Sequence, residues 1–205
     1  MSKKKKAGGK APASLEELVE KVLEPVVANP VPEGIAILGS HPATVGQAPF
    51  DKDWLIYSCS PHNFEHRTLP RFDEWFEVHK PIADKTRAYP YLRFLESVPL
   101  VWMRDKEAIH LFPGAKEYPE EEMKDIFGPF TFTSSIAYIL AKAIVDCTEQ
   151  GINKLGLWGI MQASENEYTY QRPGIQNLIW EATKRDIQVI CPRESKLFEP
   201  MPEIW

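Results

Sequence analysis

Small and polar residues follow two of the most apolar segments of the chain, at the point where each segment ends. Gly39 and Ser40 close the first segment, Thr44 comes a few residues later, and Gly159 closes a second segment. Small residues and hydroxyls allow backbone N–H groups to approach a phosphate or a sugar closely. The spacing matches neither the G-x-G-x-x-G pattern nor the P-loop pattern, so an ordinary turn after a strand is the alternative. We expect ligand contacts from all four residues.

A pair of serines, Ser134 and Ser135, stands where a long helical pattern begins. The free N–H groups and the dipole of a helix make its N-terminus suited to an anion. Capping the helix is the alternative explanation, and it accounts for one serine but does not require two hydroxyls. We therefore expect both serines to contact the ligand.

A polar stretch at 165–173 combines two carboxylates, an amide and a guanidinium directly before a predicted helix. Arg172 has the fork of N–H donors that binds a phosphate or a carboxylate through two parallel hydrogen bonds. Glu167 is suited to bind ribose hydroxyls or to act as a base, and Tyr168 and Gln171 add further hydrogen-bonding groups. We expect these four residues in the site. A solvated loop in which the Glu and Arg side chains pair with each other is the alternative.

Glu77 and His79 stand two residues apart in a predicted strand, so their side chains should lie on the same face. His79 falls at the carboxyl end of that strand, where an imidazole is well placed to act as a general base or a hydrogen-bond donor. A histidine that is satisfied in the core or at an edge is the alternative. The candidate catalytic residues are His79 and Glu167.

The segment from His62 to His66 matches H-x-x-E-H, an inverted zinc-peptidase pattern in which Glu65 would be the base. On a helix both histidines would face the same way and could bind zinc. However, Pro61 and Pro70 flank the segment, and no partner helix offers a third ligand. A chance match explains the pattern better, and we predict no metal site.

These residues need a scaffold, and the alternation of apolar strand patterns with helical patterns supplies one. The predicted strands are 34–40, 54–59, 75–79, 99–103, 154–158 and 187–191, and the predicted helices are 14–25, 89–97, 119–127, 134–150 and 173–185. The pattern predicts an α/β fold, a single Rossmann-like domain with a mostly parallel sheet of about six strands and helices on both faces. Ligands bind outside the carboxyl ends of the strands in such a sheet, so the segments singled out above should meet at one edge. The region 104–133 reads as irregular, either a lid or a packing insert.

Composition narrows the class of protein further. The 205 residues are enough for one domain at 14–205, preceded by a Lys-rich tail at 1–13 that should be disordered. A net charge of −5 argues against a general nucleic-acid surface and leaves the tail as the segment that could contact phosphates. No apolar run reaches the roughly 20 residues of a membrane helix. Three scattered cysteines indicate reduced thiols and therefore a cytoplasmic protein.

Long stretches of the sequence resemble a group of uncharacterised bacteriophage-type proteins. The stretch FTSSIAYILAKAIVDCTEQGINKLGLWGI and the later ENEYTYQRPGIQNLIWEATKRDIQVICP carry the resemblance, as do GSHPATVGQAPFDKDW and WFEVH. The group has a Ser-Ser-x-Ala-Tyr helix, an apolar strand that ends in Gly-x-Asp, and Glu-Tyr-x-x-Gln-Arg-Pro. Together these stretches cover most of residues 34–197. The resemblance implies a Rossmann-like fold and the cytoplasm of a phage host, and it brings no established activity.

The serine-pair helix with its Gly-ended strand is also similar, over about one strand–helix–strand unit, to pterin diphosphokinase-like and bacterial sialyltransferase-like Rossmann families. Those families bind nucleotides or nucleotide sugars, so the similarity implies a nucleotide-like small molecule as ligand. The sequence departs from the pattern at Met161, where an Asp would be a natural metal or ribose ligand. Glu165 and Glu167 are the acids that could take its place.

Three hypotheses for function result. The first is a nucleotide- or nucleotide-sugar-binding group-transfer enzyme, of glycosyl or phosphoryl/diphosphoryl type. Arg172 and the helix start at Ser134 would hold the phosphates, and His79 or Glu167 would supply acid–base help. The second, motivated by Met161, is a ligand-binding or sequestering accessory protein without chemistry. The third is a structural or assembly protein that uses the Lys-rich tail. The sequence identifies no cofactor.

Overall fold

The computed structural model describes residues 30–59, 69–80, 89–161 and 167–198. The chain divides into two compact units, Met1–Pro30 and Val31–Trp205, and the description that follows concerns the second. The predicted Lys-rich tail, the helix at 14–25 and the H-x-x-E-H segment lie outside the described residues.

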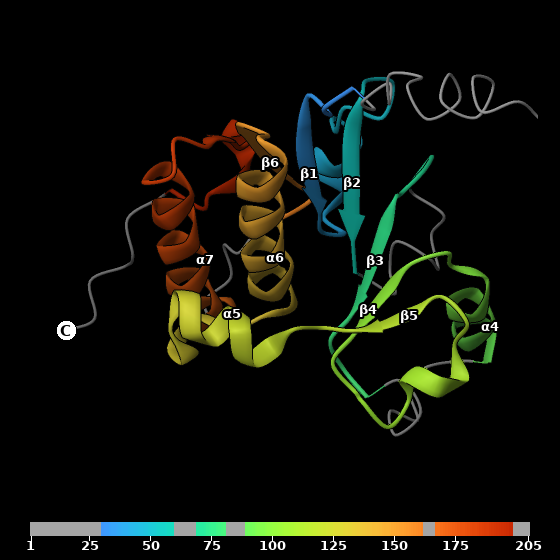
Figure 1. Ribbon diagram of the computed structural model, residues 1–205. Coiled ribbons are helices and arrows are strands. Elements are labelled where there is room, and N and C mark those ends of the chain that lie inside the picture. Colours follow the sequence, from blue (N-terminus) through green and yellow to red (C-terminus); the bar gives the residue numbers. More distant parts are fainter. Residues whose placement is uncertain (1–29, 60–68, 81–88, 162–166, 199–205) are drawn as a thin grey trace, which may run out of the picture. The chain divides into compact units, whose positions relative to one another are not determined.

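A parallel sheet of seven strands forms the centre of this unit (Figure 1). The strands are β1 (Gly34–Leu38), β2 (Trp54–Ser58), β3 (Glu74–Glu77), β4 (Val101–Met103), β5 (Ala115–Glu117), β6 (Lys154–Trp158) and β7 (Gln188–Ile190). Their order across the sheet is β5-β4-β3-β2-β1-β6-β7, and every pairing is parallel. The predicted Rossmann-like α/β fold is confirmed. The seventh strand, β5, lies in the region that was predicted to be irregular.

Helices connect the strands and cover both faces of the sheet. They are α2 (Pro42–Val45), α4 (Tyr89–Ser97), α5 (Glu120–Phe127), α6 (Ser135–Gln150) and α7 (Glu167–Thr183), with short 3-10 helices at Ile109–Leu111, Pro129–Thr131 and Arg193–Ser195. The prediction was wrong about where the last helix begins, because α7 starts at Glu167 and continues through Pro173. Proline removes one backbone hydrogen bond within a helix, and contacts with the rest of the protein outweigh that loss here.

The side chains of β1 alternate between two cores, as expected for a strand that is buried on both sides. Ile35 and Ile37 pack in the core formed with α5, α6 and α7, whereas Ala36 and Leu38 face the opposite core with Trp54 and Trp158. Helix α4 belongs to the side opposite α6, where its apolar residues pack on β3 and β4. Helices on both faces are therefore confirmed.

The strands are staggered, so their carboxyl ends do not lie at one level. Leu38 is in register with Ser58, and Ser58 is in register with Trp75. Strand β3 then continues two residues beyond Trp75, to Glu77, while β1 stops at Leu38. Strands β4 and β5 keep the register of β3. We call this side of the sheet the carboxyl edge, and β3, β4 and β5 project beyond β1 there.

A buried polar network ties α6 to the sheet beneath it. The Tyr57 hydroxyl donates to Asp146 at 2.9 Å, and Lys142 pairs with the other oxygen of that carboxylate. Trp102 Nε1 donates to Glu74 at 2.6 Å, and Lys142 Nζ lies 4.8 Å from the centre of the Trp102 ring. Burial raises the pKa of Glu74, and the hydrogen bond from Trp102 opposes that rise. The network joins side chains from β2, β3 and β4 to one face of α6.

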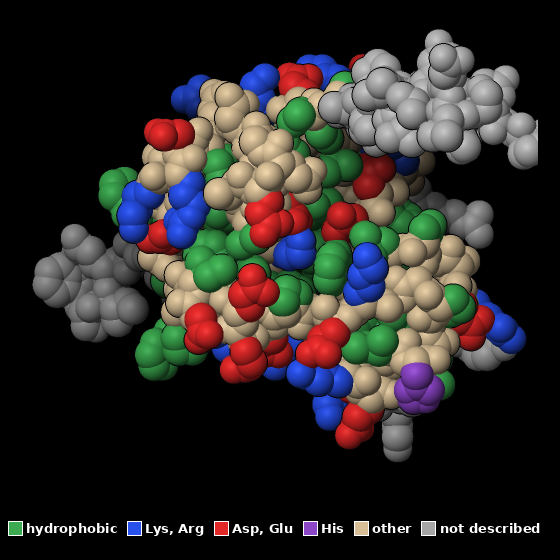
Figure 2. All heavy atoms as spheres, in the orientation of Figure 1, with side chains coloured by type: hydrophobic (Ala, Val, Ile, Leu, Met, Phe, Trp, Pro, Cys, Tyr) green, Lys and Arg blue, Asp and Glu red, His purple; other side chains and the backbone are tan. Residues whose placement is uncertain are grey.

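The described surface carries mixed charge. On the face shown in Figure 2, acidic and basic side chains are interspersed, and neither sign gathers into a continuous field. Among the described residues, no helix combines the length and apolar character needed to span a membrane. In the same part of the chain, no three His, Cys, Asp or Glu side chains are grouped as they would be around a metal ion.

Candidate functional site at the carboxyl edge

Gly39 and Gly159 lie close together at the point where the order of the strands in the sheet reverses. Strands β1 and β6 are neighbours, and from β1 the chain proceeds to β2 on the other side, so the topological switch point lies between β1 and β6. The Gly39 N–H donates to Trp158 O at 2.8 Å, and the His41 N–H donates to Gly159 O at 2.8 Å. Gly159 adopts a positive φ of 67°, a conformation that favours glycine. The two exit loops are therefore held together by backbone contacts.

Replacing Gly39 by alanine is expected to lower the free energy of unfolding by about 3 kcal/mol, because there is no room for the added atom. A Cβ on Gly39 would lie 2.2 Å from the Gly159 carbonyl oxygen. The control is Gly46→Ala, where a Cβ meets nothing within 4 Å, and a change of less than about 1 kcal/mol is expected. Urea denaturation followed by circular dichroism measures both. Equal effects of the two substitutions would contradict the close approach of the loops.

The hydroxyls predicted in this loop have different surroundings. Thr44 is buried, and its Oγ1 accepts the Gly159 N–H at 2.8 Å, so this side chain links the two exit loops. Ser40 is half-buried beside the glycine contact. The structure thus gives Thr44 a supporting role, and ligand contact by Gly39, Ser40, Thr44 and Gly159 remains a prediction.

The start of α6 and the first turns of α7 lie against each other at the same edge. Ser134 caps α6, its Oγ accepting the Ala137 N–H at 3.2 Å. Thr133 Oγ1 donates to the Gln171 carbonyl at 3.2 Å, and a Cβ on Gly174 would lie 2.3 Å from the Thr131 carbonyl oxygen. Two of the predicted segments, the paired serines and the Gln-Arg stretch, are therefore brought together.

The polar stretch differs from the prediction from Glu167 onward, because that part forms the first turns of α7 rather than a loop. Arg172 is only 5% exposed and therefore presents little of its side chain to solvent. Glu167 and Tyr168 lie in the first turn of the helix, and their side chains lie outside the described residues. Ser135 is half-buried in the first turn of α6. Ligand contacts of these residues remain predictions.

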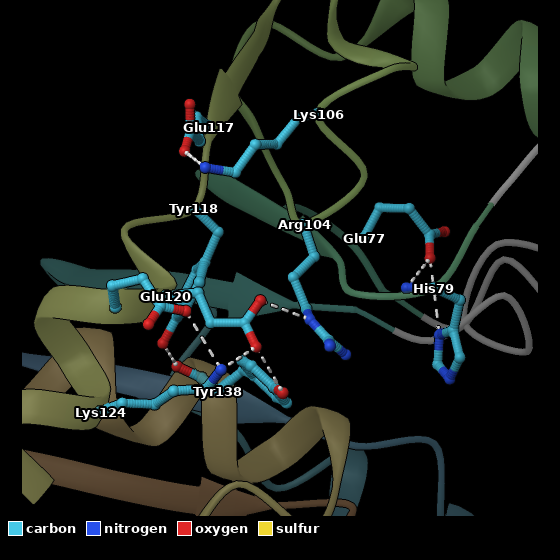
Figure 3. Close-up of polar contacts among 10 residues, drawn as sticks. Glu77, His79, Arg104, Lys106, Glu117, Tyr118, Glu120, Lys124 and Tyr138 are labelled. Atoms are coloured by element: carbon cyan, nitrogen blue, oxygen red, sulfur yellow. Dashed lines mark hydrogen bonds and ion pairs between the residues drawn. The ribbon is translucent and has the colours of Figure 1, made fainter. Parts of the chain in front are cut away.

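At the carboxyl end of β3, an exposed imidazole faces a buried carboxylate (Figure 3). His79 Nδ1 lies 3.5 Å from Glu77 Oε1, with the His79 side chain 58% exposed and that of Glu77 only 1% exposed. The same carboxylate oxygen accepts the His79 N–H at 2.9 Å, and Glu77 Oε2 accepts the Tyr91 hydroxyl at 2.7 Å. Trp75 Nε1 donates to that hydroxyl in turn, at 3.1 Å. A buried carboxylate thus lies beside Nδ1 of His79, and the other ring nitrogen, Nε2, points away from it (Figure 3).

A second polar group, absent from the sequence-based candidates, stands next to this pair. Arg104 follows β4, and its backbone N–H donates to the Glu77 carbonyl at 3.1 Å. Arg104 Nε donates to Glu120 at 2.7 Å, and its guanidinium lies 5.0 Å from the centre of the Tyr138 ring. Lys124 Nζ lies 2.8 Å from the same carboxylate. Burial acts to raise the pKa of Glu120, but the hydrogen bonds from Lys124 and Arg104 outweigh it, so this pKa is lowered.

Topology places all three groups at one edge. The first group consists of the loops that follow β1 and β6, and the second of the N-termini of α6 and α7, the helices that return from this edge. The third group consists of His79 and Arg104, which follow the carboxyl ends of β3 and β4. Strands β1 and β3 are separated by β2 alone, a distance of about 10 Å for two strand spacings. That separation is comparable with the length of a nucleotide. The fold is that of a Rossmann-like protein, and its candidate groups lie along one edge of the sheet.

The fold is similar to that of known sugar-transferring enzymes. The sialyltransferase CstII from Campylobacter jejuni, in complex with a substrate analogue, cytidine-5′-monophosphate, gives a TM-score of 0.53 at 17% identity, over 83% of this chain and 85% of that chain. A variant of the sialyltransferase CST-II in complex with CMP gives 0.53 at 16% identity, over 77% and 81%. No protein-family model and no curated protein sequence matches the chain. At this level of identity the likeness concerns the fold.

Proposed function

We propose that this protein is a glycosyltransferase that binds a nucleotide sugar at the carboxyl edge and transfers its sugar to a hydroxyl group of an acceptor. The observation that carries the proposal is the exposed His79 imidazole beside the buried Glu77 carboxylate, at the carboxyl end of β3. The likeness in fold to CMP-binding sialyltransferases supports a nucleotide sugar as the donor. The phosphoryl and diphosphoryl transfers predicted as alternatives have no such support.

In the proposed reaction His79 acts as the general base. The acceptor oxygen attacks the anomeric carbon, the bond from that carbon to the phosphate oxygen breaks, and the nucleotide leaves with the electron pair. His79 Nε2 takes the proton of the acceptor hydroxyl, while Glu77 stabilises the imidazolium that forms. The first N–H groups of α6 are suited to the nucleotide, because donors at a helix N-terminus bind phosphate oxygens, whereas the Gly39 and His41 N–H groups are already bonded to the Trp158 and Gly159 carbonyls.

A protein that only binds or sequesters its ligand is the second hypothesis from the sequence, and a structural protein is the third. Neither requires an exposed imidazole with one ring nitrogen beside a buried carboxylate. That arrangement is typical of groups that move a proton, and it favours catalysis. The bacteriophage-type origin, the cytoplasmic location and the role of the Lys-rich tail stay predictions.

A donor panel tests the proposal. The purified chain is incubated with CMP-linked sialic acid and with uridine- and guanosine-diphosphate sugars, with and without a mixture of oligosaccharide acceptors. We expect nucleotide release from one class of donor and an acceptor product heavier by one sugar, both detected by mass spectrometry. Tight binding of a nucleotide that is recovered unchanged would replace the proposal with the sequestering hypothesis. Absence of both turnover and binding across the panel would refute it.

A further inference from the structure

We propose that Arg104 binds the anionic group of the substrate and holds it beside His79, an inference that rests on the proposed function and names the ligand subsite within it. The group is an oxyanion, either the phosphate of the donor nucleotide or a carboxylate on the sugar. Three features carry the proposal. They are the way in which Arg104 is held, the direction of its remaining donors, and its place next to His79.

Arg104 is held on two sides, which fixes the plane of its guanidinium. Glu120 accepts from Nε at 2.7 Å, and the Tyr138 ring supports the guanidinium at 5.0 Å. Glu120 is itself fixed by Lys124 at 2.8 Å and receives the Tyr138 hydroxyl at 3.4 Å. Because the orientation is set in advance, little side-chain entropy is lost when a ligand binds.

The contact with Glu120 uses Nε, which leaves the terminal nitrogens of Arg104 as donors. In Figure 3 these nitrogens point away from Glu120. The side chain is 41% exposed, so a ligand can reach it. A guanidinium that presents its terminal nitrogens binds planar carboxylates and phosphates through paired hydrogen bonds. The arrangement therefore differs from an ion pair in which the carboxylate accepts hydrogen bonds from the terminal nitrogens of the arginine.

The two lysines near Arg104 form ion pairs with carboxylates of their own. Lys124 lies between Glu120 and Glu121, at 2.8 and 3.2 Å, so its charge is shared by two carboxylates. Lys106 pairs with Glu117 at 2.5 Å. Arg104 is the cation of this group that combines a buried support with solvent-facing donors, and we assign the oxyanion to it for that reason.

Arg104 and His79 follow neighbouring strands, β4 and β3, at the carboxyl edge of the sheet. The Arg104 N–H donates to the Glu77 carbonyl at 3.1 Å, and Glu77 also receives the His79 N–H. A cation at this place would orient the anionic group of the substrate and stabilise the negative charge that develops when the nucleotide leaves. The general base and the anion-binding group would thus come from adjacent strands, β3 and β4.

Binding measurements on three substituted proteins and four probes test the assignment. The substitutions are Arg104→Gln, Arg104→Lys and, as a matched control, Lys106→Gln, which removes a nearby cation that pairs with Glu117. The probes are cytidine, CMP, free sialic acid and inorganic pyrophosphate, studied by calorimetry. The Arg104 Nε–H signal is followed by NMR in the unsubstituted protein. Thermal unfolding confirms that each substituted protein is folded.

If Arg104 binds the phosphate, Arg104→Gln raises the Kd of CMP by about 10- to 100-fold, since a hydrogen bond to a charged group is lost. The Kd of cytidine, which has no phosphate, stays unchanged. If Arg104 binds the sugar carboxylate, the substitution raises the Kd of sialic acid instead. Lysine restores only part of the affinity because it lacks the fork. Lys106→Gln changes each Kd by less than about threefold.

The two proposals fail in different ways. If no nucleotide or sugar binds but pyrophosphate moves the Arg104 Nε–H signal, the anion site stands and the glycosyltransferase does not. If CMP binds equally well to the Arg104→Gln and unsubstituted proteins, and sialic acid does too, the assignment of Arg104 is overturned. An Arg104 signal that responds to no anion overturns it as well.

Discussion

Replacing His79 by glutamine is expected to lower kcat for sugar transfer by about 10²- to 10⁴-fold, with the Kd of the nucleotide changed by less than about threefold. Glutamine keeps a polar side chain of similar reach but cannot accept a proton at neutral pH, and general-base catalysis contributes an effect of this size. The exposed position of His79 means that the substitution should not disturb the core. Steady-state kinetics and calorimetry measure the two quantities. His110→Gln, at an exposed histidine in the 3-10 helix after β4, is the control and should leave kcat unchanged.

The role of Glu77 in positioning the imidazole can be separated from its role in the core. Glu77→Gln is expected to lower kcat by about tenfold or more without raising KM, because the imidazole loses the carboxylate that fixes it. Tyr91→Phe removes the hydrogen bond from the Tyr91 hydroxyl to Glu77 and keeps the contact of Glu77 with His79, so it should reduce stability with little effect on kcat. If both substitutions lower kcat equally, Glu77 acts through general stability of the core.

A kcat of the His79→Gln protein equal to that of the unsubstituted protein would show that His79 is not the general base.

Replacing Asp146 by alanine is expected to lower the free energy of unfolding by about 3–5 kcal/mol, the largest stability effect of any substitution considered. Asp146 is 4% exposed and accepts hydrogen bonds from Tyr57 and Lys142. Its removal leaves the Lys142 ammonium, whose side chain is 13% exposed, without its carboxylate. The cost of a buried charge without a partner is large because water can no longer solvate it.

The control for Asp146 is Glu96→Ala, which breaks the exposed ion pair with Arg93. The two side chains of that pair are 60% and 40% exposed, and a change of less than about 0.5 kcal/mol is expected. Urea denaturation monitored by tryptophan fluorescence and by circular dichroism gives both values. A loss below about 1 kcal/mol for Asp146→Ala would mean that water or a neighbouring group takes over the role of the carboxylate.

The sequence was sufficient for the architecture because the strand and helix signals are strong and alternate regularly. Nine of the ten helices and strands predicted in the described chain, among them 89–97 and 134–150, match the structure to within about two residues at each end. Strand β5 escaped prediction because Ala115-Lys116-Glu117 is short and polar, and its pairing with β4 decides its conformation. Helix α7 was placed too late because Pro173 normally marks the first turn.

The candidate site was only partly predictable. His79 was found because a two-residue spacing on a strand puts Glu77 on the same face. Arg104 was not among the predicted site residues, because nothing in the sequence around it indicates that Glu120 and Tyr138, which come from later helices, contact it. The contact of Gly39 with Gly159 joins positions 120 residues apart, so only the fold reveals it.

The position of β1 inside the sheet, between β2 and β6, also bears on how the chain is made. Its partner β2 follows about 20 residues after β1, whereas its other partner, β6, follows about 120 residues after β1, as the pairings Ile35–Leu55 and Ile35–Leu155 require. During most of synthesis β1 is thus an open edge that could pair with the wrong strand. The order of translation leaves the Gly39–Gly159 contact among the last parts of the molecule to form.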